Sequence, residues 1–128
     1  MTYDHNQFLI DLIVKGDHHL IESLYDPSFD QLKQLVDRGL LYLFPESLQT
    51  EEICLHAVKR DVWAIRYIKN PSEQIQMAAV RQTGYAVRFI KNPSEQVQMA
   101  AVTQDGYAIQ FIDNPSEAVQ LAAVQQIS

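Results

Sequence analysis

The chain has 128 residues, of which 47% are hydrophobic, and its formal net charge at pH 7 is −6. This length and composition suffice for one folded domain with a buried core. No apolar run approaches the roughly 20 residues of a membrane-spanning helix, and the first residues are acidic where a signal peptide would be basic. We therefore expect a cytoplasmic protein with no membrane partner.

The first 48 residues are predicted to hold diverged helical repeats or an N-terminal cap, and the sequence leaves both alternatives open. Pro27, Val36 and Leu43 keep positions at which the later repeats have proline and aliphatic residues, although the pattern between them is irregular. This segment contains three basic and eight acidic residues, which give it a net charge of −5.

Residues 71–92 and 93–114 are two copies of one 22-residue unit. Their sequences, PSEQIQMAAVRQTGYAVRFIKN and PSEQVQMAAVTQDGYAIQFIDN, are identical at 16 of 22 positions. Residues 49–70, QTEEICLHAVKRDVWAIRYIKN, form a diverged copy in the same register, and residues 115–128 form the first part of a further unit. The sequence thus predicts one domain, residues 1–128, built from tandem repeats.

Each unit has the local signals of a helix start. Asn92 is the expected N-cap, Pro93 the first helical residue, and Glu95 the acid that closes a capping box. Asn70 and Asn114 occupy equivalent positions. We therefore predict that a helix of about 10 residues begins at each of these prolines.

A second, shorter helix is predicted after Gly84 and Gly106, which would break the first helix. A strand is excluded because the apolar residues do not alternate. Helices this short are marginal alone, so they need neighbouring units, and alanines such as Ala79 would permit close approach. The predicted fold is all-α, an α-solenoid of stacked 22-residue two-helix repeats.

The short element A-V-x-x-x-G-x-A occurs twice, as AAVRQTGYA and AAVTQDGYA. It resembles an uncharacterised helical repeat of bacterial, phage and giant-virus proteins, and the resemblance covers about residues 49–128. It implies an architecture similar to HEAT or leucine-rich-variant solenoids, which usually present an extended surface to a protein or nucleic acid. It implies no particular activity.

The basic residues gather in one part of the chain. Residues 49–92 carry a net charge of +3, whereas residues 93–128 have four acids and no base. Arg66 and Arg88 share one repeat position, and Lys69 and Lys91 share another, so stacking would align them in a basic stripe. With Arg81 they form the predicted partner-binding set. The favoured alternative is that these cations complement helix dipoles, because the third repeat lacks them.

Two other residue types recur at fixed repeat positions. Glutamines form the rows Gln76, Gln98, Gln120 and Gln82, Gln104, Gln126, while aromatic residues form the rows Trp63, Tyr85, Tyr107 and Tyr67, Phe89, Phe111. We favour structural ladders or solvated positions for the glutamines over contacts to a partner. The aromatic residues would suit base stacking, but helical spacing beside aliphatic residues favours core packing.

The sequence contains no recognisable catalytic or metal-binding motif. The obvious reactive side chains are His5, His18, His19, His56 and Cys54. No two of the histidines are four residues apart on one helix face, and one cysteine can form neither an intrachain disulfide nor a thiol zinc cluster. Phosphate-binding glycine motifs are also missing. We therefore predict no catalytic residue, no metal and no cofactor.

The last unit keeps the apolar pattern of the internal units. Val119, Leu121 and Val124 are predicted to leave a stacking surface that a homodimer or another protein would cover. The alternative is that the second helix of the preceding unit shields this surface.

Three classes of function remain after these considerations. The leading hypothesis is a non-catalytic protein-binding adaptor or inhibitor, of which a narrower version is a phage or mobile-element protein that acts on a host complex. The second hypothesis is nucleic-acid binding through the basic stripe, which the acidic flanking segments oppose. An enzyme is the third, and no reaction can be proposed for it.

Overall fold

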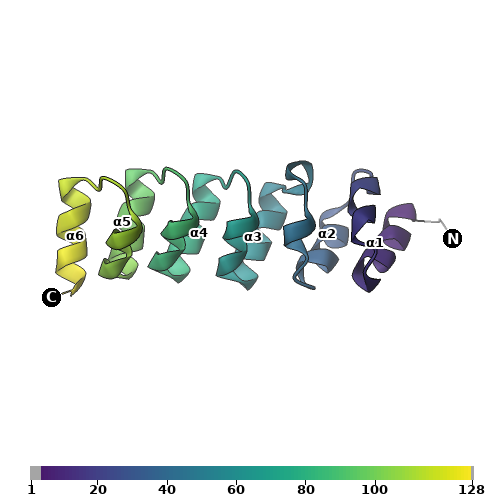
Figure 1. Ribbon diagram of the computed structural model, residues 1–128, viewed down its shortest axis with the longest axis horizontal. Coiled ribbons are helices and arrows are strands. Elements are labelled where there is room, and N and C mark those ends of the chain that lie inside the picture. The colour runs from purple at the N-terminus through teal and green to yellow at the C-terminus, as the bar shows by residue number, and fades with distance from the viewer. Residues whose placement is uncertain (1–3, 128) are drawn as a thin grey trace.

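The computed structural model describes residues 4–127, and these residues form helices and loops without a strand. The all-α prediction is confirmed. α-Helices alternate with 3-10 helices, and the α-helices lie side by side in a single row that runs from one end of the chain to the other (Figure 1). The 3-10 helices lie behind this row, and the two termini are at opposite ends.

The α-helices of the repeats begin at intervals of 22 residues. From residue 51 onward the elements are α3 (Glu51–Arg60), η4 (Val62–Tyr67), α4 (Glu73–Gln82), η5 (Gly84–Phe89), α5 (Glu95–Gln104), η6 (Gly106–Phe111) and α6 (Glu117–Ile127). The preceding elements are α1 (His5–Lys15), η1 (His18–Ser23), α2 (Phe29–Val36), η2 (Leu41–Leu43) and η3 (Glu46–Leu48). The first part of the chain is similar but less regular, because two 3-10 helices, η2 and η3, follow α2.

The start of each repeated α-helix differs from the sequence prediction by two residues. The N-cap of α5 is Ser94, whose Oγ accepts a hydrogen bond from the Val97 N–H, and the helix begins at Glu95. Asn92 and Asn114 instead have positive φ values of 53° and 51°. Asparagine tolerates this left-handed conformation, which turns the chain from one unit into the next, so the following serine is the residue placed to cap the helix.

The capping serines also connect consecutive units. The Ser72 Oγ donates to the Glu51 carboxylate at 2.8 Å. Two further links, from Ser94 to Glu73 and from Ser116 to Glu95, repeat this contact at 2.5 Å. The glutamates that were expected to close a capping box in their own helix therefore bind the cap of the next helix.

The second helix of each unit is a 3-10 helix of six residues. It begins after Asp61, Thr83 or Asp105, whose side chain accepts a hydrogen bond from the N–H two residues later. Such local side-chain bonds stabilise a tight turn at the point where the α-helix ends. Its buried side chains, among them Ala86 and Val87, pack toward the core.

The closest contacts between units occur where glycine and alanine meet. Ala79 and Ala101 are fully buried, as expected for alanines that permit close approach. A Cβ atom on Gly84 would lie 2.3 Å from the carbonyl oxygen of Ala101, and a Cβ on Gly106 would lie 2.5 Å from that of Ala123. Neither glycine has a positive φ. The glycines are therefore required for close packing, whereas the α-helices already end at the preceding C-cap residues, Thr83 and Asp105.

Replacement of Ala101 by glutamate is expected to unfold much of the domain. A buried polar group without a hydrogen bond costs about 2–7 kcal/mol and an unpaired carboxylate costs more, which is a large part of a typical stability of roughly 5–15 kcal/mol. Urea unfolding followed by circular dichroism measures the effect. Gln104→Glu is the matched control, because it adds the same charge at an exposed position of the same helix. Equal midpoints for the two variants would contradict the packing described.

Candidate functional site

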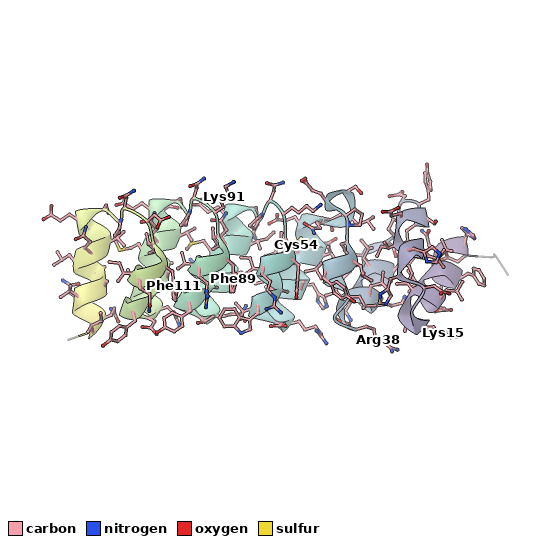
Figure 2. The ribbon with its side chains drawn as sticks, in the orientation of Figure 1. Lys15, Arg38, Cys54, Phe89, Lys91 and Phe111 are labelled. Carbon is pink, nitrogen blue, oxygen red and sulfur yellow. The ribbon has the colours of Figure 1, made fainter. Side chains whose placement is uncertain are left out.

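The predicted partner-binding set is exposed but does not form one stripe. Arg66 and Arg88 lie on η4 and η5, whereas Lys69 and Lys91 lie in the loops that follow these helices. Figure 2 shows Lys91 at the edge formed by these loops. Arg81 lies on α4, among the residues on the outer side of the α row. The five cations therefore belong to three surfaces: that of the 3-10 helices, that of the loops and that of the α row.

An aromatic strip runs along the 3-10 helices. It consists of Tyr42, Trp63, Tyr67, Tyr85, Phe89, Tyr107 and Phe111, together with Arg66 and Arg88. Trp63 is 37% exposed, Tyr67 is 42% exposed and Tyr107 is 58% exposed. The expectation that these rows belong to the core is wrong at those positions. The 3-10 helices bury their aliphatic side chains toward the α row. Tyr85, Phe89 and Phe111 are half-buried and pack against the core, as predicted for these rows.

The rings of the aromatic strip contact one another from unit to unit. Trp63 packs edge-to-face against Phe89 with ring centroids 5.8 Å apart, and Tyr85 packs in the same way against Phe111 at 5.6 Å. Tyr42 and Tyr67 extend the contacts toward the N-terminus at 6.1 Å. Such ring pairs stabilise a fixed geometry beyond the area they bury. The strip therefore contains three ordered ring pairs, two of which are joined through Arg88.

Arginine side chains lie across the rings of this strip. The guanidinium of Arg88 is 5.2 Å from the ring centre of Phe89 and 5.0 Å from that of Phe111. Arg66 lies 4.8 Å from the ring centre of Tyr67. These distances are typical of cation–π contacts, which hold the guanidinium plane in place. A guanidinium held in this way presents its N–H groups in the arrangement that carboxylates bind.

The loop lysines line a small hollow of their own. Lys69 and Lys91 border a cavity of about 240 Å³ together with Phe89 and Asn92. The hollow is shared between two consecutive loops. Lys69 and Lys91, which share one repeat position, therefore border the same hollow. Arg81 does not border it.

The glutamine rows have structural contacts. The side-chain amides of Gln76, Gln98 and Gln120 donate to the carbonyl oxygens of Pro71, Pro93 and Pro115 at 2.9–3.0 Å. These bonds lie within a unit, so this row is not a ladder between units. In the second row, the Gln82 amide donates to the Val58 carbonyl at 3.0 Å and thereby links two units.

His56 belongs to a polar cluster that joins α2 to α3. Its Nε2 lies 2.7 Å from an Asp37 carboxylate oxygen, and Lys33 bonds the other oxygen at 2.9 Å. Hydrogen bonds from Lys33 and His56 hold the pKa of Asp37 below its usual value. Within residues 4–127, no group of histidine, cysteine and acidic side chains is arranged to hold a metal ion. The cluster therefore connects α2 to α3.

Cys54 is buried in α3 and does not face His56, which turns to Asp37. Burial is the main cause that raises the pKa of the Cys54 thiol to about 11, and Glu51 adds to it. A thiol with such a pKa is almost entirely protonated at neutral pH, and the thiolate is the nucleophile. Cys54 is therefore a core residue.

We expect native Cys54 to resist a thiol-disulfide reagent at pH 8 and to react at once in 8 M urea. Both the raised pKa and the burial slow the reaction in the folded protein. Absorbance of the released thiolate measures the fraction that has reacted. Complete reaction of the folded protein within seconds would show that this thiol is accessible and activated.

The residues predicted for self-association lie partly in the core. Val119 is 0% exposed and faces inward, so its assignment to an interface is wrong. It occupies the position that Ile75 and Val97 hold in the core of the preceding units. Leu121 is 59% exposed and Val124 is 61% exposed, so the surface includes these two. Self-association through them stays a prediction.

Comparisons with known protein families, curated proteins and solved structures returned no match to this chain. The resemblance to an uncharacterised helical repeat therefore stays a prediction, and functional assignment depends on the surfaces above. None of the helices within residues 4–127 is both long enough and apolar enough to cross a bilayer.

Proposed function

We propose that the chain is an α-solenoid of 22-residue repeats that binds a partner protein and performs no catalysis, as an adaptor or inhibitor. The regular spacing of α3 to α6 and the unit-to-unit contacts of serine with glutamate support the solenoid. In such an architecture each unit adds the same side chains to a long surface, which suits the binding of another macromolecule.

The observation that carries this proposal is the aromatic strip. Tryptophan, tyrosine and arginine are the residues that most often dominate the energy of protein interfaces, and here they occur together. The ring contacts and the cation–π contacts order Trp63, Arg66 and Arg88 before a partner arrives. Less conformational entropy is therefore lost on binding.

The charge of the strip indicates an acidic surface on the partner. Arg66 and Arg88 lie in the segment with a net charge of +3, between segments of −5 and −4. This pattern would select a partner that places carboxylates opposite the two arginines. The same partner would have no acidic surface opposite the acidic segments 1–48 and 93–128.

Nucleic-acid binding is the second candidate, because exposed rings beside arginine can also stack on bases. It requires phosphates to approach the molecule closely. The acidic flanks oppose that approach, since affinity for nucleic acid depends on neutralised phosphates.

The double variant Arg66→Glu with Arg88→Glu tests the proposal. We expect it to lose a protein that the unchanged chain captures from an extract of the source cells, because it reverses charge within the strip. Lys15→Glu with Arg38→Glu is the matched control: it makes the same change in charge at two exposed residues in the first part of the chain (Figure 2). Circular dichroism verifies that both variants are folded.

Nuclease treatment and a salt series separate the two candidates. Protein capture that survives nuclease, and that the strip variant alone loses, supports the proposal. Capture of nucleic acid with a steep dependence on salt would favour the second candidate. Equal capture by the strip variant and the control would show that the aromatic strip is not the binding surface.

A further inference from the structure

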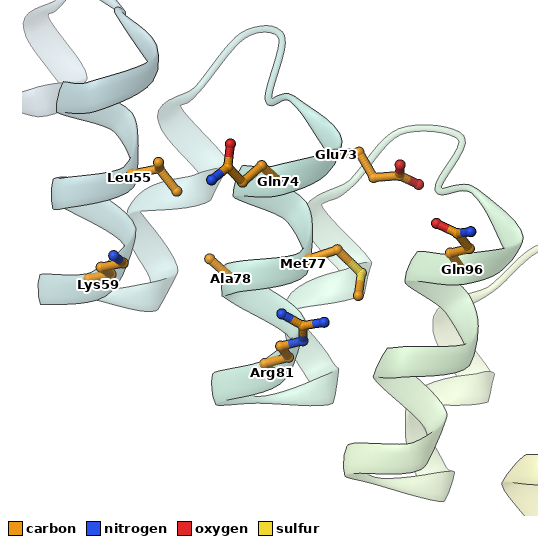
Figure 3. A pocket seen from close by; sticks show the side chains of 8 residues that line it. All are labelled: Leu55, Lys59, Glu73, Gln74, Met77, Ala78, Arg81 and Gln96. Atoms are coloured by element: carbon orange, nitrogen blue, oxygen red, sulfur yellow. The ribbon is translucent and has the colours of Figure 1, made fainter.

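The outer side of the α row has two adjoining depressions, which share Met77, Arg81 and Gln96, and Figure 3 shows the first of them. The first is lined by residues of α3, α4 and α5 and has a volume of about 440 Å³, and the second is lined by residues of α4 and α5 and has a volume of about 520 Å³. Residues of the first include Leu55, Lys59, Gln74 and Ala78, and residues of the second include Met77, Arg81, Gln96 and Ala100.

The two depressions have the same chemistry because they are related by one repeat. Each has an aliphatic or thioether side chain, a cation, a glutamine and an alanine at positions 22 residues apart. The pattern stops on both sides. Toward the C-terminus Thr103 replaces the cation and Ala118 the glutamine, whereas toward the N-terminus Asp37 and Glu52 take these positions. The molecule thus has a matched pair of depressions.

Side chains from both neighbouring helices converge on each depression. Figure 3 shows Leu55 directed from α3 toward α4, while Gln74 and Ala78 lie on the side of α4 that faces α3. Met77 is directed from α4 toward α5, Arg81 lies in front of α4, and Gln96 lies near the start of α5. All of these side chains are partly or fully exposed. Methionine adapts its shape to different apolar groups, which suits a binding surface.

The charge of the pair indicates an acidic occupant. Lys59 and Arg81 are exposed and stand on adjacent helices, at equivalent positions, in a protein with a net charge of −6. Among residues 4–127, Glu73 is the only acid that borders either depression, and its carboxylate accepts a hydrogen bond from Ser94. Carboxylates of a bound segment would therefore meet the two cations.

The glutamines favour an extended backbone in the occupant. A glutamine amide has both donors and an acceptor, so Gln74 and Gln96 can bond the N–H and C=O groups of a peptide. The backbone groups of a helix are already bonded internally and would not use them. Packed helices lie about 8–10 Å apart, and three residues of a chain in the polyproline II conformation complete one turn, return the side chain to the same side and cover about 9 Å. Side chains three residues apart therefore match the spacing of the two depressions.

We propose that these depressions bind an extended, acidic segment of a partner protein. Two apolar side chains, at positions i and i+3, enter successive depressions beside Leu55 and Met77. The carboxylates of the segment pair with Lys59 and Arg81. This surface uses none of the residues of the aromatic strip, so it adds a second binding site on the α row.

A fluorescent peptide of about eight residues is the probe. It has two leucines at i and i+3, with aspartate and glutamate at the other central positions, and its anisotropy is titrated with the full chain. We expect saturable binding that is at least about tenfold weaker when the leucines stand at i and i+2 or at i and i+5. A peptide with lysine in place of the acids should bind at least as weakly.

Variants of the protein test the residues. Lys59→Glu with Arg81→Glu should weaken peptide binding about tenfold or more, whereas Lys15→Glu with Arg38→Glu, which changes the charge equally, should leave it unchanged. Gln74→Ala with Gln96→Ala should also weaken binding, although it alters no charge. The strip variant Arg66→Glu with Arg88→Glu should bind the peptide normally, so this site and the proposed function can fail separately.

Several results would overturn the proposal. These are the lack of saturable binding to folded protein, equal affinity for the three leucine spacings, and unaltered affinity in either depression variant. Tighter binding of a helical peptide with leucines seven residues apart would also overturn it, because such a peptide does not require the glutamines.

Discussion

The structure depends on one close contact, in which a 3-10 helix approaches the α-helix of the next unit without an intervening side chain. Gly84 meets the Ala101 carbonyl there, and Gly106 meets the Ala123 carbonyl. Short helices have little stability alone, so the packing between units supplies what the helices lack. At these two positions only glycine permits the distance, whereas Val62 holds the equivalent position in the unit of residues 49–70.

Both candidate surfaces follow from the register of the units. Since each unit is displaced by one step relative to its neighbour, residues 22 apart become neighbours in space. On the 3-10 side this places Trp63 and Tyr85 against rings of the following unit. On the α side it places equivalent side chains, such as Lys59 and Arg81, along two adjoining depressions. Small differences in sequence between units then decide where each surface ends. One example is the position held by Arg81 in one unit and by Thr103 in the next.

The sequence was sufficient to predict the helices and the period, because caps, proline and apolar spacing are local signals. It did not reveal that Glu73 binds the cap of the next unit, since a capping box has the same residues. The exposure of Trp63 and Tyr107 was also missed. The aromatic spacing fits either side of a short helix, and only the position of the α row determines which side is outside. Arg81 was grouped with Arg88 because a linear sequence does not separate the two surfaces.

The measurement that most directly tests this account is equilibrium unfolding of Gly84→Ala in urea, followed by circular dichroism. Alanine suits a helix better than glycine does, so intrinsic propensity alone would raise the stability. We predict instead a loss of about 1–3 kcal/mol, because the new methyl group would collide with the backbone of Ala101. An unchanged or higher free energy of unfolding would show that the units are not held at this distance, and would contradict the account.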